Sequence, residues 1–171
     1  MNVVNKIAVA GLLVGALAGC ASDPFHIVQI NCPAVAIVSN TGSVTHFEGE
    51  TRNTDDVVYD ATISAVRSSC QQTENIRFDV AFSINAEAGP KFEGDSIILP
   101  YYVLLLRDNH LITAKQVYQT TLHFAPGSKH ASTTESIVQT FDNLDIARRY
   151  DYELLIGFQL SPEDVAYNAL R

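Results

Sequence analysis

Strict alternation of apolar and polar side chains is the feature that most constrains the fold of this chain. It is clearest over Ile76–Ala86, where every second side chain from Ile76 to Ile84 is isoleucine, phenylalanine or valine and those between are small or polar. Because successive side chains of a strand point to opposite faces, this pattern predicts a strand with one face buried. A helix would need apolar residues three and four positions apart. The chain is therefore expected to build at least one half-buried sheet.

Other segments share this strand-like composition, and polar residues with Gly, Pro, Asn or Asp separate most of them. Ser68–Asn75, which contains Cys70, is predicted to be a polar turn. Short strands at this spacing favour an all-β fold, an antiparallel β-sandwich of about seven or eight strands. The predicted strands are Pro33–Ser39, Val44–Glu48, Val57–Arg67, Ile76–Ala86, Ile97–Arg107, Leu111–Phe124, Thr133–Phe141 and Tyr150–Leu160.

The C-terminal segment carries the signals of a helix start. Ser161 suits the N-cap, Pro162 the first helical position, and Glu163 and Asp164 the first turn. A short helix reaching about Leu170 is expected.

A tyrosine near the last predicted strand suggests the kind of sandwich. Leu144 is followed six residues later by Tyr150, just before that strand, which is similar to the tyrosine corner of immunoglobulin and fibronectin type III domains. Tyr152 is the competing candidate, and a plain core or interface tyrosine is the alternative to both. The chain has no tryptophan and an early cysteine pair. The resemblance therefore implies a fibronectin-like sandwich rather than a true immunoglobulin domain.

The first nineteen residues resemble a sorting signal. Lys6 precedes an apolar run over Ile7–Leu17, too short for a membrane-spanning helix of about 20 residues. Leu17-Ala18-Gly19-Cys20 resembles the lipobox of bacterial lipoproteins. The resemblance implies that the chain is cut before Cys20 and that this residue carries acyl chains. An ordinary signal peptide with a chance cysteine is the alternative.

The residue after Cys20 bears on which membrane holds the protein. Position 21 is alanine, whereas lipoproteins kept in the inner membrane of enteric bacteria often carry aspartate there. The resemblance thus implies an outer-membrane lipoprotein of a Gram-negative bacterium with its body on the periplasmic face, and makes the inner membrane less favoured. Residues 20–31 would be the membrane tether and residues 32–171 the sandwich domain. Eleven flexible residues span about 18 Å on average and about 36 Å when extended, so the body would sit close to the membrane.

The cysteine count fits an oxidising compartment. If Cys20 is acylated, Cys32 and Cys70 remain as an even pair. We predict a disulfide between them that closes a loop of about 38 residues and contributes about 3–4 kcal/mol. Two buried free thiols are the alternative. Their spacing does not favour a metal site.

No catalytic motif stands out, and the chain is not expected to be an enzyme or to hold a cofactor or metal. His46 lies four residues before Glu50 and could be an acid or base partner, but the sequence ties no nucleophile to it. Asp55, Asp56, Asp142 and Asp145 lack the spacing of a calcium-binding loop. We expect them to lie in solvent-exposed loops. A net charge of −8 argues against a nucleic-acid partner. The other histidines, which are scattered, are His26, His110, His123 and His130.

One segment, Ile97–Leu106, is apolar at both strand parities, so both of its faces need cover. The C-terminal helix could supply it through Val165, Ala166, Ala169 and Leu170. A partner protein or a second copy could cover an exposed patch instead, and a small apolar-ligand cleft is a third option. These patterns favour a membrane-anchored, non-catalytic binding or scaffolding module of the cell envelope, possibly an accessory subunit of an outer-membrane complex. A periplasmic carrier of a lipid or other apolar ligand is the alternative, and a hydrolase whose site is unreadable here is a third.

Overall fold

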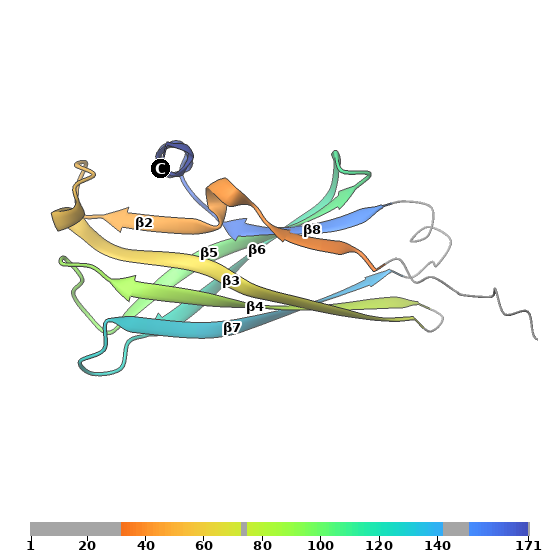
Figure 1. Ribbon diagram of the computed structural model, residues 1–171, viewed down its shortest axis with the longest axis horizontal. Helices are drawn as coiled ribbons and strands as arrows, with labels where there is room; N and C mark the ends of the chain where they lie inside the picture. Colours follow the sequence, from red (N-terminus) through yellow and green to blue (C-terminus); the bar gives the residue numbers. More distant parts are fainter. Residues whose placement is uncertain (1–31, 73–74, 142–150, 171) are drawn as a thin grey trace, which may run out of the picture. The chain divides into compact units, whose positions relative to one another are not determined.

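Two four-stranded sheets face each other across one hydrophobic core in the computed structural model, which describes residues 32–72, 75–141 and 151–170 (Figure 1). The β5 sheet has the order β1 (Ala34–Ile37), β8 (Tyr152–Phe158), β5 (Ser96–Arg107), β6 (Leu111–His123). The β4 sheet has the order β2 (Ser43–Phe47), β3 (Val57–Gln72), β4 (Ile76–Ala88), β7 (His130–Phe141). Two 3-10 turns, η1 (Ser39–Thr41) and η2 (Thr54–Asp56), and one helix, α2 (Pro162–Ala169), complete the described elements. The predicted all-β sandwich with a short C-terminal helix is confirmed.

The alternation in β4 sets the inner face of its sheet. Its burial alternates along the strand, and Phe78 and Ile84 have no exposed surface. Strands β5, β6 and β8 supply the facing layer of apolar side chains. Burial of a large aliphatic or aromatic side chain contributes about 1.5–3 kcal/mol, so this double layer is the main stabilising element of the body. Its largest fully buried members are Phe78, Phe82, Phe158, Ile84, Leu99, Leu122, Leu154, Ile156 and Val80.

Strand β3 corrects the sequence interpretation in two ways. The segment predicted to be a turn from Ser68 continues the strand to Gln72, and Cys70 pairs with Phe78 of β4. A β-bulge between Ser64 and Arg67, with Ala65 at a φ of 51°, adds one residue to the strand. Because one extra residue exchanges the two faces of a strand, the apolar alternation predicted through Ala65 stops there and Ala65 is exposed.

One strand pair runs parallel. Strand β1 pairs with β8 in parallel register, whereas every other strand pair in the described parts is antiparallel. The predicted Cys32–Cys70 disulfide is present, with Cα atoms 6.0 Å apart. Since Cys32 lies just before β1 and Cys70 lies in β3, this bond joins the two sheets.

The tyrosine-corner prediction falls partly outside the described residues, because Tyr150 is not among them. Tyr152, the competing candidate, opens β8 and packs its ring on Phe141 at the end of β7, with centroids 4.8 Å apart. Its ring therefore makes a contact between the two sheets.

Helix α2 begins as predicted but packs elsewhere than on β5. The Ser161 hydroxyl accepts a hydrogen bond from the Asp164 amide at 3.1 Å, which is an N-cap. The Asn168 side-chain amide donates to the carbonyl oxygens of Asn40 and Ser43, so the helix lies on η1 and β2. Leu170 is 90% exposed. The helix therefore does not provide the apolar cover expected for Ile97–Leu106.

The centre of that strand is covered by η1 instead. The Tyr102 ring lies beside Gly157 of β8, and its hydroxyl hydrogen-bonds the Thr41 hydroxyl at 2.7 Å. The Lys115 ammonium stands 5.0 Å from the Tyr102 ring centroid. This arrangement depends on glycine at position 157, because a Cβ there would overlap the Thr41 hydroxyl oxygen and come within 2.6 Å of the Tyr102 hydroxyl.

We predict that Gly157→Ala destabilises the domain by about 1–3 kcal/mol, since overpacking a filled site forces neighbours apart. Urea unfolding measures the change. The double variant Thr41→Ala/Gly157→Ala should lose less than the sum of the two single variants, because the first substitution removes the overlapping hydroxyl. Additive losses would show that the contact between these residues is not the cause.

Candidate functional site

The most elaborate cluster of polar side chains in the described parts lies where β2 meets the start of α2. Arg52 of the loop after β2 forms an ion pair with Asp164 of the helix at 3.1 Å. The same guanidinium lies over the rings of Tyr167 and Phe47, at 5.0 and 5.6 Å from their centroids. These two rings meet edge to face. Arg52 thus links the helix to the end of β2 through an ion pair and cation–π contacts.

A hollow of about 430 Å³ opens beside this cluster. Its lining brings together His46 and Glu50, which the sequence suggested as partners, and adds Glu163. The His46 ring stacks on Tyr59 at 5.1 Å. Burial and the nearby Asp164 carboxylate raise the pKa of the Tyr59 phenol. The complete lining is His46, Phe47, Gly49, Glu50, Arg52, Glu163 and Asp164.

The chemistry of this lining suits binding better than group transfer. It offers three carboxylates, a guanidinium, an imidazole and an aromatic ring, and it includes no serine, threonine or cysteine that could act as a nucleophile beside His46. A ligand with a positively charged or hydroxyl-rich surface would find hydrogen-bond acceptors and a ring face here. We name this hollow the Arg52 pocket.

The other residues singled out from sequence do not converge. His110 lies in the β5–β6 turn with its Nδ1 2.6 Å from the Asp108 carbonyl oxygen, and His123 and His130 end β6 and begin β7. Asp56 accepts a hydrogen bond from the Thr51 hydroxyl at 2.6 Å within its own loop. Among the described residues, no group of three or more His, Cys, Asp or Glu side chains is placed to hold a metal ion. Cys20, His26, Asp142 and Asp145 lie outside the described residues.

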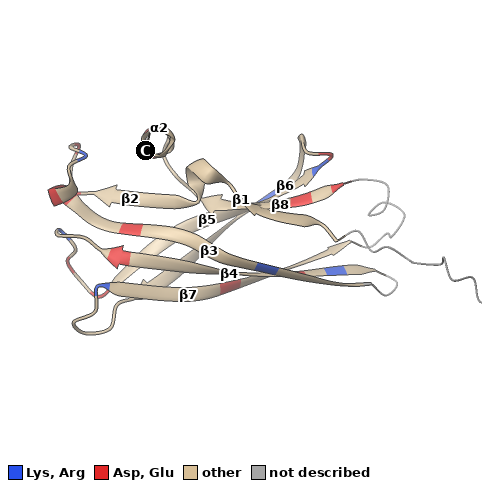
Figure 2. Cartoon of the chain, viewed as in Figure 1, with Lys and Arg blue, Asp and Glu red and all other residues tan. Residues whose placement is uncertain are grey.

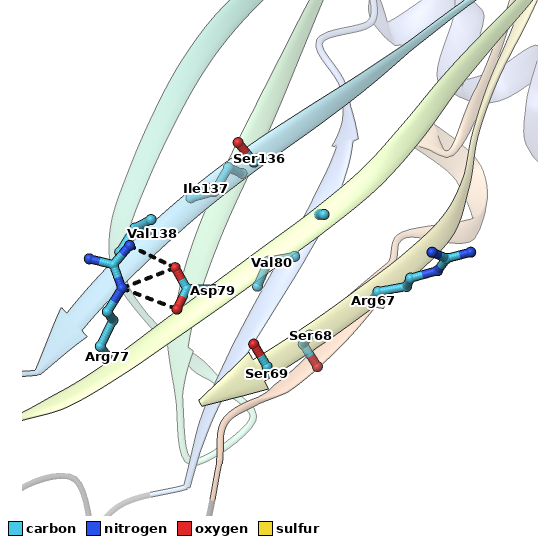
Figure 3. Close-up of a pocket in the computed structure, with 10 residues that line it drawn as sticks. Arg67, Ser68, Ser69, Arg77, Asp79, Val80, Ser136, Ile137 and Val138 are labelled. Atoms are coloured by element: carbon cyan, nitrogen blue, oxygen red, sulfur yellow. Dashed lines mark hydrogen bonds and ion pairs between the residues drawn. The ribbon is translucent and has the colours of Figure 1, made fainter. Parts of the chain in front are cut away.

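The outer face of the β4 sheet is mostly polar. The Asn85 amide donates to the Ser64 hydroxyl and accepts from the Ser132 hydroxyl, both at 2.8 Å, which links three neighbouring strands. A second hollow of about 410 Å³ lies on this sheet, between Arg67 and the Arg77–Asp79 ion pair (Figure 3). The Arg77 guanidinium donates to both carboxylate oxygens of Asp79, so that charge is already neutralised within the hollow.

A half-buried carboxylate joins the two sheets at the open side of the sandwich. Glu135 of β7 points inward and accepts hydrogen bonds from the hydroxyls of Tyr101 at 3.2 Å and Thr120 at 2.6 Å. An inward-pointing charge on an edge strand discourages edge-to-edge association. Burial, together with the Glu135 charge and hydrogen bond, raises the pKa of Tyr101 far above its usual value.

This shift predicts a loss of stability in alkali. A phenol whose pKa is higher in the folded state stabilises the fold below its unfolded pKa of about 10, and that contribution disappears as the pH rises toward the folded value. We expect the free energy of unfolding to fall above pH 10, and to fall less steeply in Tyr101→Phe. Thr120→Val, which removes the other donor to Glu135 but keeps the phenol, should lose stability evenly across this range. Equal alkaline slopes in wild type and Tyr101→Phe would contradict the assignment.

The outer face of the β5 sheet carries exposed apolar side chains among polar ones. Ile98, Ile112 and Val117 are 60%, 58% and 53% exposed, and Leu104 and Leu106 lie half-buried beside them. The sequence pattern indicates that both faces of β5, over Ile97–Leu106, are apolar and need cover. Solvent reaches every side chain of β6 from Leu111 to Val117, including those on the core side, so the β5–β6 hairpin extends beyond the packed core.

The three comparisons with known proteins give no relative for this chain: no family model, no curated protein and no solved structure matches it. Within the described residues, no helix is long and apolar enough to cross a membrane. Sequence reasoning missed the Arg52 pocket as a unit, because Arg52 and Asp164 are 112 positions apart and neither carries a local motif.

Proposed function

We propose that this chain is a lipid-anchored lipoprotein of the Gram-negative outer membrane, facing the periplasm, whose sandwich body is a non-catalytic binding or scaffolding module. The lipobox at Leu17–Cys20 carries the proposal. The Cys32–Cys70 disulfide supports it, since such bonds persist in oxidising compartments. Two or more acyl chains would hold the body stably at the membrane surface.

The point where the tether joins the body indicates how the module is oriented relative to the membrane. Residues 20–31 enter the body at Cys32, which is fixed to the far end of β3 by its disulfide. The Arg52 pocket lies near the other end of β3, where Val57 begins the strand. Cys70 lies thirteen positions after Val57 in β3, a length of about 43 Å at the usual rise of a strand. We infer that the pocket faces away from the membrane, where it can meet an envelope partner.

The packed interior favours a binding module over the alternative of a lipid carrier. A carrier needs an enclosed apolar cavity of about 300 Å³ or more. The space between the sheets is instead filled by Phe78, Phe82, Phe158 and their aliphatic neighbours.

Site-specific photo-cross-linking in intact cells tests the proposal. A cross-linker at Glu50, in the pocket lining, is expected to capture one recurring envelope protein, and a matched cross-linker at Thr62, exposed on the outer face of β3, is not. Adding Arg52→Gln should abolish the Glu50 product. Capture that is equal at both positions, or no capture together with co-purified lipid, would overturn the binding module in favour of a carrier.

A further inference from the structure

The β5–β6 hairpin ends in a cluster of apolar side chains that the core does not use. Leu111 and Ile112 are 42% and 58% exposed, and Val117 is 53% exposed. Leu104 and Leu106 lie on the same outer face, paired with Lys115 and Ile112. We call the four that share this face, Leu104, Leu106, Ile112 and Val117, the hairpin patch; Leu111 pairs with Arg107 on the opposite face.

The strand register sets the hairpin patch beside the point where the chain enters the body. Ala34, two residues after Cys32, pairs with Glu153 of β8, which pairs with Leu106 of β5, which pairs with Ile112 of β6. These four residues form one row across the β5 sheet. Figure 1 shows the start of β1 and the β5–β6 hairpin at the same end of the sandwich.

Charge is distributed unevenly between the two ends (Figure 2). The end that contains the disulfide and the hairpin carries four Lys or Arg and four Asp or Glu among its described residues. The opposite end carries three Lys or Arg against eleven Asp or Glu. The net negative charge of the described chain therefore lies at the end with the Arg52 pocket. The hairpin end comprises the described residues 32–38, 66–72, 75–81, 102–117, 137–141 and 151–157, and the opposite end comprises the rest.

Because of this difference in charge, only the hairpin end of the body is suited to contact an anionic bilayer. A surface rich in carboxylates is repelled by anionic lipids within about a Debye length, whereas a neutral apolar surface is not. Only eleven residues, 21–31, separate Cys20 from Cys32, so they reach about 36 Å at most when fully extended. The hairpin end is thus the part of the body held nearest to the membrane.

We propose that the hairpin patch lies on the surface of the bilayer that holds Cys20, as a second membrane contact that orients the body. This inference rests on the proposed lipid anchor. The turn residues Arg107–His110 are polar or charged, so the contact is interfacial: the patch meets the headgroup and upper acyl region and the turn stays among the headgroups. With the hairpin held down, the acidic end and the Arg52 pocket point into the periplasm.

The chain has no tryptophan, so single substitutions provide unique fluorescent reporters. Ile112→Trp reports on the patch. Val138→Trp is the matched control, because Val138 is 47% exposed at the same end but lies on the outer face of the β4 sheet. Both acylated proteins are reconstituted into vesicles of phosphatidylethanolamine and phosphatidylglycerol with brominated acyl chains. We expect bromolipid to quench most of the emission of Ile112→Trp and little of Val138→Trp.

Three results would overturn the inference: no quenching of Ile112→Trp, equal quenching of both reporters, or a blue shift of Ile112→Trp that depends on protein concentration without vesicles. The last result would identify a second copy of the chain as the occupant. The mass of the Cys20 peptide, measured on the same sample, tests the anchor separately. If Cys20 is not acylated, its free thiol is coupled to a maleimide lipid and the two reporters are compared again, so failure of the anchor leaves the patch tested.

Discussion

Replacing Cys20 with serine is expected to abolish the acyl anchor. Serine lacks the thiol that would receive the diacylglycerol group, so no acyl chain is added and the cut before position 20 does not occur. Because anchoring needs two or more chains, their loss is not compensated by the body, whose net charge changes from −8 to −9 once Lys6 and the rest of the leader are removed. The product should be soluble or an uncleaved precursor.

Fractionation of cells with a carbonate wash, followed by immunodetection, measures this change. The circular dichroism of the variant should still be that of a β-sandwich, since residues 1–31 lie before the first strand, β1. Ser22→Ala, a neighbouring substitution outside the lipobox, should remain in the membrane fraction. A Cys20→Ser protein that is processed and fractionates like the wild type would contradict the anchor.

Removing the disulfide with Cys32→Ala/Cys70→Ala is expected to lower the free energy of unfolding by about 3–4 kcal/mol, the loop entropy of a cross-link across 38 residues. The native state should change little, because Cys32 is exposed and Cys70 is only half-buried opposite Phe78. The bond also holds β1, a strand of only four residues, to the rest of the body.

Urea unfolding of the double variant, beside the wild type with and without reductant, measures the effect. Reduced wild type should unfold at about the same urea concentration as the double variant, and reductant should not affect the double variant. A loss below about 1 kcal/mol, far under the loop-entropy value, would show that the cross-link does not constrain the unfolded chain.

The secondary structure could be predicted from the sequence wherever a local residue pattern determines it. Strand β4 follows from alternation, and α2 follows from Ser161, Pro162 and the acids after them. The end of β3 could not be predicted, because the bulge at Ala65 exchanges its faces and most residues beyond it are polar. Polar residues continue a strand there because β4 pairs with them, which is a tertiary effect.

Part of the candidate site could likewise be predicted from sequence, and part could not. His46 and Glu50 are close in sequence and line one hollow, so their association could be suggested in advance. The Arg52 cluster could not, because it forms when α2 returns to β2 across more than a hundred residues. The apolar character of Ile97–Leu106 was visible in the sequence, but its cover was not: η1 shields Tyr102 through the Thr41 hydroxyl, while Ile98 stays exposed.

Mass spectrometry of the mature N-terminus, on protein purified from the membranes of its own cells, tests the central claim most directly. We expect a chain that begins at Cys20 and whose first residue carries the added mass of a diacylglycerol group and one further acyl chain. A chain that begins at Met1, or a Cys20 that carries no fatty acid, would contradict it.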